Sequence, residues 1–180
     1  MSQKLLFVIP ECYIDTALVE CILSEHVNHQ HSCNNVVRTM KERYGNGFAV
    51  GVIDNDKRRV GYLGECSLIA KSRHLAIFKH QSRSHFIITV SPAMDGFVWD
   101  CAKEQGVRMS EMGFPTDLKG FEKESKSERL PFDKRFPRLF QSIKSNAEIA
   151  ILCNTLRYLC EEQYNAREDR IADFFQLTTD

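Results

Sequence analysis

Two uninterrupted apolar segments of strand length constrain the fold of this chain most strongly. They cover residues 5–9 and 48–53, and neither has the polar alternation of a strand with one face in water. Between them, Ile14, Leu18 and Ile22 recur at intervals of four residues, which is typical of an amphipathic helix. Buried strands separated by a helical pattern predict parallel pairing with right-handed crossovers. We therefore expect an α/β fold with a mostly parallel sheet flanked by helices.

A strand pair is predicted after the second apolar segment. Residues 75–79 and 85–90 carry the apolar and β-branched side chains typical of strands, on either side of a polar turn. Residues 62–70 are expected to be helical or irregular. Before the second apolar segment, residues 35–44 have helical periodicity, and Gly45 is a residue type that commonly terminates a helix.

The second half of the chain is predicted to be mainly helical. Ser91 and Pro92 form a favourable helix start, with serine as the N-cap and proline at the first helical position. The sequence from Phe132 to the end has helical periodicity. We expect an α/β domain over residues 1–112 and a helical C-terminal extension over residues 113–180.

Charge, hydropathy and cysteine usage exclude several classes of protein. Lysine plus arginine and aspartate plus glutamate number 24 each, so a globally basic nucleic-acid binder is excluded, although a local basic groove is not. No segment approaches the roughly 20 apolar residues of a membrane span, and the first apolar run is shorter than the roughly 7–15 residues of a signal peptide core. The seven cysteines form no CxxC pair, which favours free thiols in a reducing, cytoplasmic compartment.

Acidic side chains follow both predicted buried strands. Glu11 comes after the first, and Asp54 and Asp56 come after the second. Ligands of open parallel sheets bind outside the carboxyl ends of the strands, so these carboxylates are expected at one edge. Carboxylate oxygens are preferred ligands of Mg²⁺, which can assist phosphoryl chemistry. The alternative is that Asp54 and Asp56 only form a polar turn at the end of a strand.

The order of these features resembles a known family. An apolar strand, Glu11, Asp15 and an amphipathic helix, followed by a second apolar strand, Asp54, Asp56 and Lys57, are similar to the Toprim domain. That domain is the metal-binding α/β domain of topoisomerases, bacterial primases and nucleases of the overcoming-lysogenization-defect type. The resemblance covers roughly residues 4–100 and implies a Rossmann-like sheet.

The resemblance also implies roles for individual residues. Glu11 would be a metal ligand and the catalytic general acid or base, and Asp54 and Asp56 would be ligands of Mg²⁺ or Mn²⁺. The implied activity is divalent-metal-dependent phosphodiester chemistry on nucleic acid, as in a nuclease. The sequence departs from the family where Cys12 replaces a common glycine, and only Asp95 stands near a third acidic position.

Basic residues supply candidate phosphate contacts. Lys57 follows the acidic pair directly, and Lys79 and His80 belong to a predicted hairpin rich in basic residues. On a nuclease-like domain such side chains would bind phosphates and position the strand. The alternative is that they are ordinary solvated charges.

Two further groups of residues allow other chemistry. His26, His29, His31 and Cys33 are potential zinc ligands, although their spacing matches no standard zinc finger. They could instead form a solvated loop or line the strand-end cleft. Cys12 is a candidate nucleophile at a strand end, but no histidine is placed by the sequence to activate it.

A non-enzymatic alternative uses the same fold. The chain could be a catalytically inactive Toprim-like protein that acts as an interaction module. Residues 132–140 and the amphipathic C-terminal helix would then form the surface for a protein partner or a homo-oligomer. No membrane partner is expected.

Overall fold

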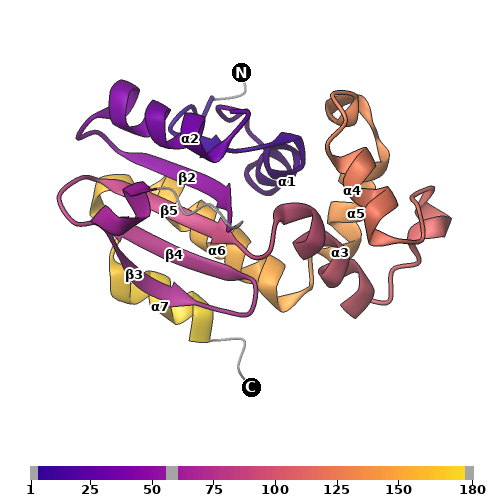
Figure 1. The fold of residues 1–180 in the computed structure, drawn as a ribbon. Coiled ribbons are helices and arrows are strands. Elements are labelled where there is room, and N and C mark those ends of the chain that lie inside the picture. The colour runs from indigo at the N-terminus through magenta and orange to yellow at the C-terminus, as the bar shows by residue number, and fades with distance from the viewer. Residues whose placement is uncertain (1–3, 56–60, 177–180) are drawn as a thin grey trace.

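The computed structural model describes residues 4–55 and 61–176, which form an open sheet surrounded by helices (Figure 1). The strands are β1 (Val8–Pro10), β2 (Ala49–Asp54), β3 (Cys66–Lys71), β4 (Leu75–His80) and β5 (His85–Val90). The helices are α1 (Tyr13–Leu23), α2 (Cys33–Thr39), α3 (Met94–Glu104), α4 (Leu118–Ser125), α5 (Arg135–Ile143), α6 (Ala147–Glu162) and α7 (Glu168–Gln176). Among these residues, no helix is long and apolar enough to cross a bilayer.

The sheet has five strands in the order β1-β2-β5-β4-β3. β1, β2 and β5 are parallel, whereas β4 is antiparallel to β5 and β3 is antiparallel to β4. The expected α/β fold is therefore confirmed, but the sheet is mixed rather than mostly parallel. The reason is the short turns that join β3, β4 and β5, because a tight connection can only return the chain antiparallel. Over residues 62–70, which were expected to be helical or irregular, the 3-10 turn Gly61–Glu65 agrees with the expectation, whereas β3 begins at Cys66.

Two apolar layers cover the two faces of the sheet. On one face, Val52 and Ile88 belong to a large core that also contains buried residues of α1 and of α3 to α7. On the other face, Val36 and Met40 pack against Ile53 and Ile87. Figure 1 shows α2 along one side of the sheet, with α6 and α7 behind it. The helices after residue 113 thus share one core with the sheet.

The helix after β5 begins differently from the sequence expectation. The peptide bond between Ser91 and Pro92 is cis, and α3 starts at Met94 with Ala93 as its N-cap. Ser91 therefore does not cap the helix, and its hydroxyl accepts a hydrogen bond from the Asn55 side-chain amide at 2.8 Å. The expected helix over residues 35–44 is present as α2 followed by a π-helical turn, Met40–Tyr44.

Candidate acidic site

Glu11 and Asp54 come together at the edge of the sheet. β1 and β2 are adjacent and parallel, with Pro10 paired to Val52, so their carboxyl ends lie side by side. The backbone amide of Asp54 donates a hydrogen bond to Glu11 Oε2 at 3.1 Å. The expectation that Glu11 and Asp54 lie at one edge of the sheet is therefore met.

A third carboxylate, Asp15, belongs to the first turn of α1. Its Oδ2 accepts a hydrogen bond from the backbone amide of Cys12 at 2.8 Å, in a capping arrangement at the start of the helix. The residue is 0 % exposed, and its Oδ1 atom is buried without a hydrogen-bond partner among the described residues. The sequence placed Asp15 in the family-like pattern, but nothing in it revealed this burial.

Burial and like charges act together on Asp15. The pKa of its carboxyl is raised well above the usual range, first by burial and then by the negative charges of Asp54 and Glu11. Burial disfavours a charged carboxylate, and nearby carboxylates disfavour it further. The acidic site, which we define as Glu11, Asp15 and Asp54, is therefore a place where added positive charge would be stabilising.

Asp54 also links the sheet to the following helix. Its Oδ1 accepts a hydrogen bond from the backbone amide of Met94 at 2.9 Å, at the amino end of α3. A helix amino end carries partial positive charge and favours a carboxylate. Asp95, the nearest sequence candidate for a further acidic ligand, instead contacts Ser125 at 3.5 Å and Lys126 at 3.7 Å.

The predicted metal site is only partly within the described chain. Asp56 and Lys57 lie outside the described residues. Within residues 4–55 and 61–176, no group of three or more His, Cys, Asp or Glu side chains is arranged to hold a metal ion. Glu11 and Asp54 offer the oxygen donors that Mg²⁺ prefers, but each has an oxygen engaged with a backbone amide.

The predicted phosphate contacts on β4 lie far from the acidic site along the sheet. β4 runs antiparallel to β5 while β2 runs parallel to it, so the carboxyl end of β4 lies at the edge opposite Asp54. Lys79 faces Glu168 at 3.9 Å, and the buried His80 contacts Glu65 at 3.2 Å. The hairpin connection thus separates Lys79 and His80 from Glu11 and Asp54.

The histidine-rich segment forms an additional edge beside β1. The backbone amide of Asn28 donates to the carbonyl of Val8 at 2.9 Å, and that of Gln30 donates to Pro10 at 3.0 Å. The segment therefore runs beside β1 toward the acidic site.

The side chains of this segment have separate partners. His26 contacts Glu20 at 3.2 Å, and His29 contacts the Thr16 hydroxyl at 2.7 Å. Cys33 packs in the smaller core on the other face of the sheet. In the part of the chain that the structure describes, these residues do not gather around one ion.

Cys12 has the wrong environment for a nucleophile. Burial, followed by the negative charge of Asp15, raises the pKa of its thiol far above the usual range. The thiolate is the reactive form of cysteine, and this environment suppresses it.

Comparison of the chain with known proteins found no matching family model, no matching curated protein and no matching solved structure.

Proposed function

We propose that this chain carries out divalent-metal-dependent phosphodiester chemistry on nucleic acid, with Mg²⁺ or Mn²⁺ at the acidic site. The observation that supports this most strongly is the electrostatic proximity of three carboxyl groups, Glu11 after β1, Asp15 in α1 and Asp54 at the end of β2. A divalent cation would offset the mutual repulsion of these groups and could contact Asp15 Oδ1, which has no hydrogen-bond partner among the described residues.

Each residue of the site would have a separate role. Glu11 and Asp54 would be metal ligands, joined by Asp56, and Glu11 would also serve as general acid or base. Asp15 would add negative charge from within the fold. Lys57, next to Asp56 in sequence, would contact a phosphate. A bound cation supplies charge stabilisation to the reacting phosphate and lowers the pKa of bound water.

Amide substitutions give a sharp test of this proposal. Glu11→Gln and Asp54→Asn each keep an oxygen that can accept the backbone hydrogen bond, so the fold should persist while the charge is lost. We expect metal-dependent cleavage of labelled single-stranded and duplex DNA and RNA to fall about 100-fold or more in each variant. We also expect millimolar Mg²⁺ to raise the melting temperature of the wild type more than that of either variant.

A matched control is available on another helix. Asp117 caps α4 by accepting a hydrogen bond from the backbone amide of Gly120 at 2.9 Å, and Asp117→Asn makes the same chemical change away from the acidic site. It should leave cleavage and the Mg²⁺ response unchanged. Full activity in Asp54→Asn, or no cleavage and no Mg²⁺ response in the wild type, would refute the assignment.

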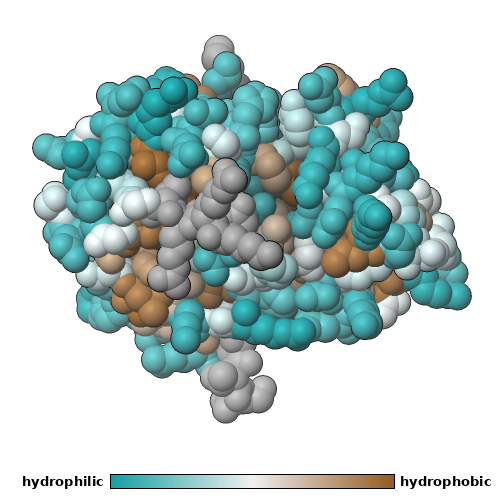
Figure 2. Space-filling view, in the orientation of Figure 1, coloured by the Kyte–Doolittle hydropathy of each residue, from teal (hydrophilic) through white to brown (hydrophobic). Residues whose placement is uncertain are grey.

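A second candidate function is a non-catalytic interaction module. The observation in its favour is that Glu11, Asp15 and Asp54 each accept a backbone hydrogen bond that joins or caps elements of the fold. Apolar surface is also exposed, with Leu68 51 % and Phe132 86 % accessible. Figure 2 shows apolar surface around the edge strand β3, the strand that contains Leu68.

This second candidate makes a different prediction from the first. A module would show no metal response, and Leu68→Ser or Phe132→Ser would weaken its self-association or partner binding. Sedimentation of the wild type and these variants, with and without Mg²⁺, separates the two functions.

A further inference from the structure

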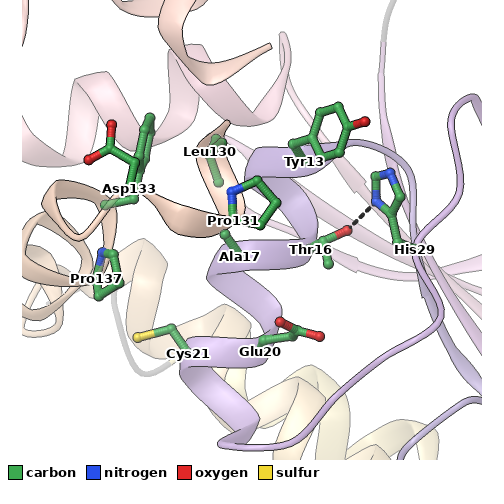
Figure 3. Close-up of a pocket in the computed structure, with 11 residues that line it drawn as sticks. Tyr13, Thr16, Ala17, Glu20, Cys21, His29, Leu130, Pro131, Asp133 and Pro137 are labelled. Carbon is green, nitrogen blue, oxygen red and sulfur yellow. Dashed lines mark hydrogen bonds between the residues drawn. The ribbon is translucent and has the colours of Figure 1, made fainter. Parts of the chain in front are cut away.

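A pocket of about 430 Å³ lies between α1 and the segment that precedes and begins α5. Figure 3 shows α1 residues along one side and residues of the 130–137 segment along the other. Its walls include Tyr13, Thr16, Ala17, Leu130, Pro131 and Phe136. Its volume is in the range of sites that take small organic ligands.

The walls of the pocket disfavour an anionic ligand. The described residues that line it include two carboxylates and no lysine or arginine. Glu20 accepts a hydrogen bond from the backbone amide of Val27 at 3.2 Å, and Asp133 is held by Arg135 at 2.6 Å. A phosphate group inside the pocket would meet negative charge, whereas a flat neutral ring would meet mainly apolar surface.

One end of the pocket is an aromatic platform. The rings of Tyr13 and His29 stack at 4.8 Å between centroids with 19° between their planes, and His31 meets the His29 ring edge-on at 4.7 Å. Flat stacked rings of this kind bind bases through their faces with little dependence on base identity.

Hydrogen bonds fix the orientation of His29. The Thr16 hydroxyl donates to the carbonyl of Cys12 at 2.8 Å, so its oxygen accepts from His29 Nδ1 at 2.7 Å. Burial, followed by the charge of His31, lowers the pKa of His29, which keeps the ring neutral near physiological pH. The ring is therefore held in place for stacking rather than for binding an anion.

Hydrogen bonds link the pocket wall to the backbone beside the acidic site. The hydroxyl of Thr16, a lining residue, donates to the carbonyl of Cys12, and the backbone amide of Cys12 donates to Asp15 Oδ2 at 2.8 Å. A phosphodiester at the acidic site would thus bring an adjoining nucleotide to the Tyr13 end of the pocket.

We propose that this pocket binds one nucleobase of a single strand whose phosphodiester lies at the acidic site. The inference rests on the proposed function and specifies its substrate: nucleic acid with at least one unpaired base beside the reacting phosphate. Thr16, Glu20 and Asp133 would face the polar edge of the base, and the apolar wall would cover its ring.

Filling the pocket tests this inference. Ala17 belongs to α1 and lines the pocket, so Ala17→Trp places a large ring inside it. Binding of a fluorescent single-stranded thymidine oligonucleotide, and of an abasic strand of the same length, would be measured by anisotropy in Ca²⁺. We expect the wild type to prefer the thymidine strand about tenfold or more, and Ala17→Trp to lose that preference.

Two variants keep the test decisive. Glu161→Trp adds the same ring at an exposed position on α6 and should retain the preference. Tyr13→Ala removes the platform without adding volume, so it replaces Ala17→Trp if circular dichroism shows that the larger side chain unfolds the protein.

The outcomes also separate this inference from the proposed function. Equal wild-type affinity for both strands, or an unchanged preference in the pocket variants, overturns the base pocket while leaving metal-dependent cleavage intact. A pocket that takes an apolar side chain of a protein partner would give that result. If neither strand binds and Mg²⁺ does not raise the melting temperature, the base pocket and the proposed function both fail.

Discussion

Asp15 shows how much one buried carboxylate can influence a site. Its Oδ2 is engaged with the backbone of Cys12, while its Oδ1 has no partner among the described residues. Two other carboxylates, Glu11 and Asp54, act on it electrostatically. An ionised Asp15 therefore destabilises the fold when no cation is bound. When a cation is bound, the same negative charge attracts it.

Replacing this charge should stabilise the metal-free protein at neutral pH. The pKa of Asp15 is higher in the folded protein than its ordinary value of 3.8 in the unfolded chain. The protonated carboxyl therefore contributes fully to stability below pH 3.8, and this contribution is lost as pH rises through the pKa of the folded protein. In Asp15→Asn, the amide oxygen keeps the Cys12 hydrogen bond and no ionisation occurs. We expect a melting temperature at least about 2–4 °C higher than wild type in EDTA at pH 7, which corresponds to about 1 kcal/mol.

The difference in melting temperature between Asp15→Asn and the wild type should shrink as pH falls toward 3.8. Mg²⁺ should raise the melting temperature of the wild type but not that of Asp15→Asn. Melting curves over this pH range, with Asp117→Asn as the control, check both statements. A variant that is less stable than wild type at every pH would contradict this account of the site.

At the scale of elements, a buried polar contact joins the 3-10 turn Gly61–Glu65 to the start of β5. The hydroxyl of Tyr62 lies 2.6 Å from His85 Nδ1. His85 is 0 % exposed, and its pKa is lowered to about 4, first by burial and then by the positive charges of Arg83 and His80. Burial also raises the pKa of Tyr62 to about 12, so both side chains are neutral near pH 7.

This contact predicts a loss of stability in mild acid. The unfolded chain binds a proton on His85 near pH 6.5, whereas the folded chain does so only near pH 4, so stability falls as pH drops through that interval. The contribution of this one group is at most roughly 3 kcal/mol.

Urea unfolding between pH 7 and pH 4 measures the effect. His85→Gln should be less stable than wild type at pH 7 and should have a flatter pH dependence. His26→Gln, a change at an exposed histidine, serves as the control and should follow the wild type. Parallel pH profiles for His85→Gln and wild type would show that His85 is not the responsible group.

On the scale of the whole molecule, the C-terminal helices complete the core of the sheet. Buried Leu152 and Ile171 belong to the same apolar cluster as Val52 and Ile88. The backbone amide of Phe48 also donates a hydrogen bond to the Tyr164 hydroxyl at 2.9 Å, which holds the residue before β2 against the C-terminal region. Without these helices, one face of the sheet would lose most of its cover.

Residues 1–112 are therefore expected not to fold alone. The full chain should unfold in a single cooperative transition, because its core is continuous across residue 113. Circular dichroism and urea titration of the full chain and of the 1–112 fragment check this. A fragment with native-like secondary structure and a cooperative transition would mean that the helical region is an independent extension.

The sequence predicted only the part of the candidate site that the pairing of the buried strands determines. Glu11 and Asp54 follow buried strands that the sequence pattern indicates, and parallel pairing of those strands brings them together. The importance of Asp15 was not visible in the sequence, because its burial depends on how other elements pack around α1. Lys79 and His80 were misplaced relative to the acidic site because their local pattern indicates a hairpin but does not show that β5 runs parallel to β2, which puts the β4–β5 turn at the end of the sheet opposite Asp54.

Local patterns in the sequence were sufficient to predict the two buried strands after which Glu11 and Asp54 stand, the helices between them and the helical character of the C-terminal half. These follow from the local period of apolar residues, which the backbone geometry of helices and strands translates directly into buried faces. The packing of the complete fold determines that the sheet is mixed, that Asp15 is buried close to Glu11 and Asp54, and that residues 13–29 and 130–137 contribute to one pocket. The physical reason is that partners distant in the chain are selected by packing of the whole core, which no local pattern specifies.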